Sequence, residues 1–209
     1  VAAARAVNYS GAGTIEFLVD KNRNFYFLEM NTRLQVEHPI TEEVVGVDLV
    51  KEQIRIANNE VLHLKQEELF QRGHAIECRI CAEDTENNFM PSPGIIKQLT
   101  EPNGIGVRID SYVYEGYEIP VFYDPMIGKL IVWATTRQYA IERMRRVLYE
   151  YKITGLKTNL SYLKRIMHTP DFVKGEYNTL FIEKNSRMLL RVNGNLSLIH
   201  ISEPTRLDV

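Results

Sequence analysis

The chain has 209 residues, 44% of them hydrophobic and 25% charged, and a formal net charge of −2 at pH 7. This composition is typical of a globular protein with one large domain or two modest ones. The near-neutral charge argues against a nucleic-acid-binding surface, and no apolar run reaches the roughly 20 residues of a membrane-spanning helix. Neither nucleic acid nor a membrane is therefore an expected partner.

Residues 1–13, VAAARAVNYSGAG, have the pattern of a helix end running into a loop. Because the chain opens inside such a pattern, we expect its start to be a truncation.

Two runs rich in β-branched and aromatic residues, TIEFLVD and NFYFLEMN, flank the polar segment KNRN and predict a β-hairpin. With the turn at Lys21–Asn24, Asp20 opposes Phe25 and Glu16 opposes Glu29. One face then carries apolar side chains and is expected to be a core face: Ile15, Phe17, Val19, Tyr26, Leu28 and Met30. The other face carries Thr14, Glu16, Leu18, Phe27, Glu29 and Asn31.

Two carboxylates that face each other across a strand pair repel. Glu16, Glu29 and Asn31 offer the hard oxygen ligands that suit Mg²⁺ bridging to phosphate. The simpler interpretation is a solvated face whose glutamates point at water, and a one-residue shift of the turn would separate them. The hairpin alone leaves both interpretations open.

The segment EMNTRLQVEHPITE follows the second strand. In an extended chain, Asn31, Arg33, Gln35 and Glu37 would alternate onto one side. The planar guanidinium of Arg33 suits a small oxyanion such as bicarbonate, and Glu37 could accept a proton from it. This sequel favours a binding site over a solvated hairpin.

A helix is expected over TEEVVGVDLVKEQIRIANN, with Thr41 and Asp48 as candidate N-caps and Asn58–Asn59 as its end. Strand-like segments follow, separated by turn signals: GHAIECRIC, GIIKQL, GVRIDSYVY, YEIPV and GKLIVWA. A second helix should begin after Thr136 and a third near Thr158. Strands packed with helices predict an α+β fold.

The two cysteines, Cys78 and Cys81, are spaced C-x-x-C. A zinc ribbon needs a second such pair, and residues three apart on a strand point to opposite faces. Cys78 shares the apolar face with Ile76 and Ile80, so we expect a buried thiol. A reduced pair is consistent with a cytoplasmic protein.

Several segments resemble those of biotin carboxylases, an ATP-grasp family: GTIEFL, FLEMNTRLQVEHPITE, GHAIECRICAED, MPSPG and YDPMIGKLIVWA. The resemblance runs from about Gly11 to about Glu183. It implies that residues 1–45 end an ATP-grasp domain and that residues 46–190 form a biotin carboxylase C-terminal domain. It gives Asp124, within YDPMIGKL, no role.

The resemblance also implies residue roles. Glu16, Glu29 and Asn31 would hold two Mg²⁺ or Mn²⁺ ions that bridge the ATP phosphates, with Leu18 near the adenine. Arg33, Gln35 and the Val36 backbone would seat bicarbonate, and Glu37 would be the general base.

Arg79 would stabilise the biotin enolate. Its strand places it on one face with Ala75, Glu77 and Cys81. Without the resemblance, a strand arginine is more often a surface residue. His38, which follows the implied base, could orient the loop.

The implied partners are a biotin carboxyl carrier protein, carboxyltransferase subunits and a second copy in a homodimer. The family's phosphate lid and ATP-neutralising lysines would precede Val1, so we expect the 209-residue chain alone to lack biotin-dependent ATPase activity. Residues 191–209 are expected to be a foreign or disordered tail, because LSLIHISEPTR, residues 196–206, matches a translated sequencing adapter.

Two other functions compete with this hypothesis. A different ATP-grasp ligase, such as a carbamoyl-phosphate synthetase relative, carries similar E-x-N-x-R residues, but QVEHP and ECRICAED argue against it. A non-catalytic module for dimer contact or carrier docking would need none of the charged residues that the resemblance assigns.

Overall fold

The computed structural model describes residues 1–190, and the expected adapter-derived segment 196–206 lies outside them. The N-terminal elements are α1 (Ala2–Ala6), β1 (Thr14–Val19), β2 (Phe25–Asn31), α2 (His38–Val45), α3 (Leu49–Ala57) and the 3₁₀ turn η1 (Gln66–Glu68). The strands that follow are β3 (His74–Cys81), β4 (Glu83–Asp84), β5 (Met90–Pro91), β6 (Gly94–Ile95), β7 (Gln98–Thr100), β8 (Val107–Ser111), β9 (Glu118–Ile119), β10 (Met126–Ala134) and β11 (Lys152–Thr154). The remaining helices are α4 (Arg137–Glu150), α5 (Leu160–His168), α6 (Pro170–Lys174) and α7 (Phe181–Leu189).

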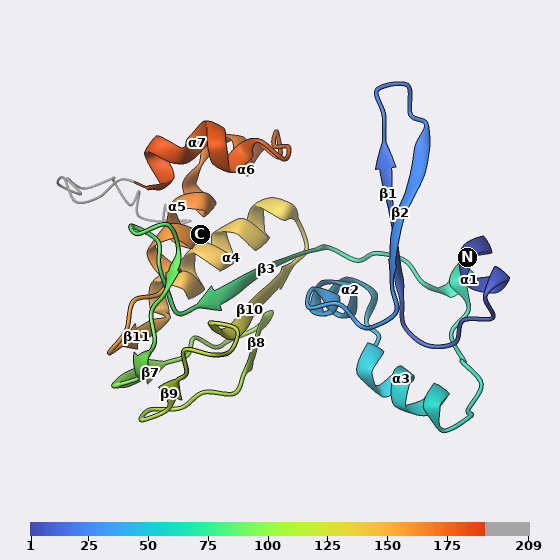
Figure 1. Ribbon diagram of the computed structural model, residues 1–209, viewed down its shortest axis with the longest axis horizontal. Coiled ribbons are helices and arrows are strands. Elements are labelled where there is room, and N and C mark those ends of the chain that lie inside the picture. Colours follow the sequence, from blue (N-terminus) through green and yellow to red (C-terminus); the bar gives the residue numbers. More distant parts are fainter. Residues whose placement is uncertain (191–209) are drawn as a thin grey trace, which may run out of the picture.

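The centre of the fold is an antiparallel sheet in the order β3–β10–β8, covered on one face by α4 (Figure 1). Alternation along β3 and β10 sends one set of side chains toward α4, where they are buried: Cys78, Ile80, Leu130, Val132 and Ala134. The predicted α+β class and the predicted burial of Cys78 are confirmed.

Helix α4 begins where the sequence predicts, because the Thr136 side chain accepts a hydrogen bond from the Tyr139 backbone N–H at 3.2 Å. Its apolar stripe faces the sheet and is buried: Ala140, Ile141, Met144, Val147 and Leu148. A 14-residue helix is thus fixed by one cap and one stripe.

The single helix expected between Thr41 and Asn59 is wrong, because the segment forms two helices. Gly46 ends α2 in a left-handed conformation, with φ 78°, that favours glycine. Helix α2 begins at His38, so Thr41 lies inside it. The cap at Asp48 is confirmed, since its carboxylate accepts from the Lys51 N–H at 2.8 Å at the start of α3.

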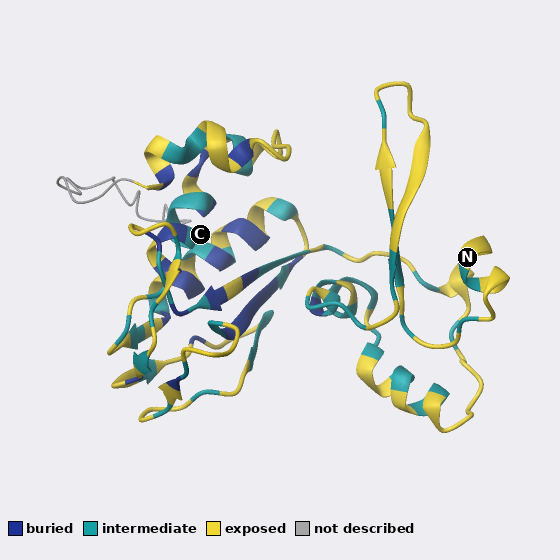
Figure 2. Ribbon diagram, in the orientation of Figure 1, coloured by how far each residue is buried: buried dark blue, intermediate teal, exposed yellow. Residues whose placement is uncertain are grey.

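The hairpin β1–β2 projects from the rest of the molecule (Figure 1), and its outer part is exposed (Figure 2). The expected pairing of Asp20 with Phe25 is wrong. Asp20 caps the turn instead, accepting hydrogen bonds from the backbone N–H groups of Asn22 and Asn24, and Val19 pairs with Phe25. A bulge at Leu28 absorbs this one-residue shift.

The bulge changes which side chains share a face. Tyr26, and not Phe27, lies opposite Leu18 on the carboxylate face, and Phe27 pairs with Phe17 on the other. The face expected to belong to a core is exposed toward the hairpin tip, since 46% of Phe17 and 66% of Val19 are accessible.

Candidate functional site

The predicted opposition of Glu16 and Glu29 is confirmed, because the register below the bulge places them directly across the strand pair. The Asn31 amide donates to Glu16 Oε1 at 3.0 Å and to Glu29 Oε1 at 3.1 Å. One amide therefore bridges the two carboxylates and offsets part of their repulsion. Leu18, two residues beyond Glu16, points to the same face of β1.

This donor set fits a hard cation that keeps waters and phosphate oxygens in its shell, because it offers two carboxylates and an amide but little more. Within residues 1–190, no group of three or more His, Cys, Asp or Glu side chains forms a complete protein-made metal cage. The hairpin is thus suited to a metal ion that arrives with a phosphate ligand.

The segment after Asn31 is not extended as expected. It turns at Val36–Glu37 and enters α2, and Gln35 Nε2 reaches back to Glu16 Oε1 at 3.5 Å. Gln35 therefore lies with the hairpin carboxylates. Arg33 is exposed and donates to the Leu34 carbonyl, so the predicted one-sided row of four side chains does not form.

Glu37 forms an ion pair with Arg79, which lies 42 residues later on β3. The structure thus brings together the two residues that the family resemblance assigned to proton transfer and to biotin. Of their side chains, 58% and 46% are exposed, so both remain accessible to a ligand.

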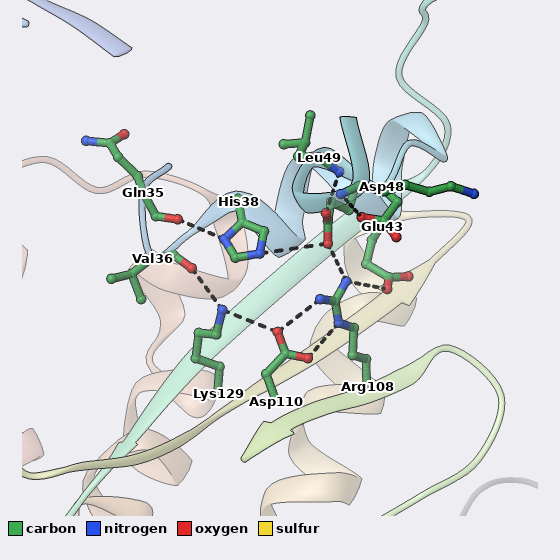
Figure 3. Close-up of polar contacts among 11 residues, drawn as sticks. Gln35, Val36, His38, Glu43, Asp48, Leu49, Arg108, Asp110 and Lys129 are labelled. Carbon is green, nitrogen blue, oxygen red and sulfur yellow. Dashed lines mark hydrogen bonds and ion pairs between the residues drawn. The ribbon is translucent and has the colours of Figure 1, made fainter. Parts of the chain in front are cut away.

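A cluster of charges lies on the same sheet face as Arg79, beneath the turn at Val36 (Figure 3). Lys129 Nζ lies 3.1 Å from the Val36 carbonyl oxygen and 3.3 Å from Asp110 Oδ2. Arg108 binds both oxygens of Asp110, at 2.8 and 3.0 Å, and Glu42 of α2 at 2.7 Å. The cluster therefore ties the turn and α2 to the sheet.

The contacts within this cluster favour the ionised forms of Asp110 and Arg108. Burial alone would raise the pKa of Asp110, but the hydrogen bonds from Arg108 and Lys129 hold it below its usual value. The hydrogen bonds to Asp110 and Glu42 raise the pKa of Arg108, against the effect of burial. Stable ionisation makes the cluster a fixed support.

Glu77 lies on the same strand face as Arg79, as predicted, and opposes Ile131 of β10. Within residues 1–190, both of its carboxylate oxygens are buried without a hydrogen-bond partner. Burial raises the pKa of Glu77, and the nearby charges of Lys129 and Arg79 offset only part of this shift.

His38 contacts the turn that precedes α2, because its Nδ1 lies 2.9 Å from the Gln35 carbonyl oxygen. Its other ring nitrogen, Nε2, lies 3.9 Å from Glu42 Oε2. Glu42 also accepts from the Leu49 N–H at 2.7 Å, and so joins α2 to the start of α3.

The sequence reasoning missed this support cluster, although a signal was present. Lys129 is the one charged residue of the strand segment GKLIVWA, and Asp110 lies two residues after Arg108 in GVRIDSYVY. A lysine flanked by apolar residues in a strand is predicted to be partly buried, and a buried ammonium group needs a paired charge. That rule could have singled out both residues.

Comparison with known proteins identifies the family. The model of the biotin carboxylase C-terminal domain matches residues 77–184, and that of the carbamoyl-phosphate synthase L chain ATP-binding domain matches residues 1–65. The chain belongs to the biotin carboxylase family. The predicted family and fold class are thus confirmed, while the predicted division after residue 45 stays a prediction.

Biotin carboxylase relatives match most of the chain. It is 56% identical over 187 residues to the biotin carboxylase of Nostoc sp., covering 90% of this chain and 42% of the relative. It is equally identical to a pyruvate carboxylase subunit of Methanothermobacter thermautotrophicus, covering 90% of this chain and 38% of that protein. The chain therefore spans about two fifths of the length of these relatives.

A solved biotin carboxylase also matches. The biotin carboxylase domain dimer of Hydrogenobacter thermophilus 2-oxoglutarate carboxylase, in complex with MgADP, ADP and bicarbonate, superimposes with a TM-score of 0.87 at 46% identity. The match covers 91% of this chain and 42% of that one. No helix within residues 1–190 has the length and apolarity to cross a membrane.

Proposed function

We propose that this chain forms the metal, bicarbonate and biotin wall of an enzyme that carboxylates biotin with bicarbonate and ATP. One observation carries the proposal: the Glu37–Arg79 ion pair brings a candidate base next to a candidate biotin-side cation. Glu37 also follows closely in sequence after the hairpin that carries Glu16, Glu29 and Asn31. The solved relative that binds MgADP and bicarbonate supports this assignment.

The hairpin would hold the divalent ions. Glu16, Glu29 and Asn31 supply the oxygen ligands for two Mg²⁺ or Mn²⁺ ions, and Leu18 supplies an apolar contact on the same face for the adenine of ATP. Bound metal would neutralise the charge of the ATP phosphates. The Asn31 amide nitrogen donates to both carboxylates, and the amide oxygen of the same side chain would be the metal ligand.

The turn after β2 would bind bicarbonate. Arg33 offers a planar cation, Gln35 an amide, and Val36 its backbone N–H. Glu37 would remove the bicarbonate proton, and the resulting carbonate oxygen would attack the γ-phosphorus of ATP, releasing ADP and forming carboxyphosphate.

Carboxyphosphate would then break into CO₂ and phosphate, and phosphate would take the proton from the biotin ureido nitrogen. Arg79 would stabilise the negative charge on the biotin oxygen while the nitrogen attacks CO₂. Arg79 now contacts Glu37, so binding of biotin would compete with this ion pair.

The partners follow from the reaction. The biotin would be carried by a biotin carboxyl carrier protein and would deliver its carboxylate to carboxyltransferase subunits. The enzyme would act as a homodimer in the cytoplasm. A relative named as part of a pyruvate carboxylase and a solved relative described as a domain dimer support the partners and the dimer.

A chimaera tests the proposal. Residues 1–190 would replace the matching part of the Nostoc sp. enzyme, and ATP cleavage would be measured with and without bicarbonate and free biotin. We expect bicarbonate-dependent, biotin-stimulated cleavage that falls by about 10²-fold or more in Glu37→Gln, since a general base typically contributes about 10²–10⁴-fold.

The matched control is Glu67→Gln, an exposed glutamate of η1, which should leave the rate unchanged. Full activity of the Glu37→Gln chimaera would overturn the proposed role of Glu37. A chimaera that folds as a dimer, binds MgADP and cleaves no ATP would contradict the proposed activity.

A further inference from the structure

Lys129 is an unusual residue for its position. It lies in β10 among fully buried apolar residues, and only 9% of it is exposed. Burying an ammonium group is unfavourable unless the charge is paired and hydrogen-bonded, because the group loses its hydration. Packing of the strand alone would therefore favour an apolar side chain here.

The strand register adds electrostatic repulsion to the unfavourable burial of Lys129. Lys129 directly opposes Arg79 on β3, so two cations face each other across the pair. On its other side it opposes Asp110 of β8, whose carboxylate it contacts at 3.3 Å. Asp110 already receives two hydrogen bonds from Arg108, so it does not require Lys129 as its partner.

The remaining contact explains the lysine. Its Nζ donates at 3.1 Å to the carbonyl of Val36, 93 residues earlier in the chain. Val36 lies in the turn between β2 and α2, outside any helix or strand. Its carbonyl belongs to the peptide unit that leads into Glu37, so the hydrogen bond fixes that peptide against the sheet (Figure 3).

We propose that Lys129 is a positioning residue for the bicarbonate turn, holding the Val36 carbonyl so that the Val36 N–H and the Glu37 side chain face the same ligand. This inference rests on the proposed function for the identity of the ligand, but not for the positioning itself. Asp110 and Arg108 hold the lysine in place, and Glu42 ties the same cluster to α2.

The positioning is tested on the full 209-residue chain by hydrogen–deuterium exchange. Lys129→Met keeps the length of the side chain but removes the donor, while Lys129→Arg keeps a donor. We expect the peptide covering residues 33–41 to exchange at least about tenfold faster in Lys129→Met, because the His38 N–H bond to Gln35 lies within the turn, and to be restored in Lys129→Arg.

Two comparisons separate positioning from general loss of structure. Peptides from α4 and β3 should exchange at the parent rate in Lys129→Met. Lys152→Met, which removes an exposed lysine from β11, should change nothing in residues 33–41. Faster exchange throughout the chain, or an unchanged turn, would overturn the proposal.

The catalytic consequence is measured in the active chimaera. Lys129→Met should raise KM for bicarbonate about tenfold and also lower kcat, because both the bicarbonate-binding backbone and the Glu37 base lose their support, and Lys129→Arg should recover most of both losses. A fall in kcat alone would overturn the link to bicarbonate. If the parent chimaera itself lacks activity, the proposed function fails, while the exchange experiment still decides the positioning.

Discussion

The hairpin β1–β2 and the sheet β3–β10–β8 are both antiparallel and both rich in apolar residues, yet only the sheet is buried (Figure 2). Phe27 of the hairpin is 59% exposed, whereas Leu130 of β10 is fully buried beneath α4. Alternation specifies which side chains share a face in both regions. Only a covering element decides whether that face becomes a core.

The two regions also differ in how they hold charge. The hairpin opposes Glu16 and Glu29 with an amide between them and leaves the pair accessible. The sheet surrounds Lys129 with Asp110 and a backbone carbonyl and leaves it nearly inaccessible. A solvent-accessible charged pair suits reversible binding of a ligand, whereas a buried charged pair suits a structural role.

The largest expected effect concerns the core. Leu130→Ala should lower the free energy of unfolding by about 2–5 kcal/mol, because it leaves a cavity between the sheet and α4. Phe27→Ala, the matched change in the hairpin, should cost less than about 1 kcal/mol, since the ring is already exposed. Urea unfolding of both variants measures the difference, and equal losses would contradict the comparison.

A smaller effect is expected at Glu77. Its pKa is raised mainly by burial, so the folded state disfavours its charged form. Glu77→Gln should therefore stabilise the chain by about 1 kcal/mol at neutral pH, a rise of about 2–4 °C in Tm. The gain should vanish as the pH falls below the ordinary pKa of a glutamate, where the carboxyl is protonated in both the folded and the unfolded states.

Thermal unfolding of the parent chain and of Glu77→Gln, measured from neutral pH down to a pH below the ordinary pKa of a glutamate, checks the prediction. Glu67→Gln, at an exposed position, is the control and should show no pH-dependent gain. A loss of stability in Glu77→Gln at neutral pH would mean that its charge is needed beside Lys129 and Arg79.

The smallest expected effect is the reaction of the two cysteines. Burial raises the pKa of Cys78 and of Cys81 to about 12, so almost no thiolate exists near neutral pH. Iodoacetamide should label neither thiol in the native chain at about pH 7.5, and both after unfolding in guanidinium. Mass spectrometry reads the labelling, and fast native modification of Cys81 would show that its strand end is open.

Much of the local structure was predictable, because it depends on neighbours in the sequence. The caps at Asp48 and Thr136 and the buried thiol of Cys78 all follow from alternation or from capping chemistry. The two-helix break at Gly46 had a local signal as well, since glycine adopts the left-handed conformation that ends a helix.

The errors near the hairpin tip have a different cause. A hairpin register depends on the turn type, and Asp20 could serve either as the last strand residue or as the cap of the turn. The bulge at Leu28 then corrects the register before it reaches the carboxylates. The predicted turn was one residue too short, and the bulge restores the register, so the predicted pairing of Glu16 with Glu29 is nevertheless correct.

The sequence by itself determined the family, the apolar faces of β3 and α4, and the residue types of the proposed bicarbonate and metal site. Tertiary structure alone decided that Glu37 meets Arg79, that Lys129 meets Val36, and that the apolar hairpin face stays exposed in this chain. The physical reason is the separation along the chain. Periodicity and capping act over a few residues, whereas the Glu37–Arg79 and Lys129–Val36 contacts join residues 42 and 93 positions apart. Only the packing of α2 and the preceding turn against the sheet brings these residues together.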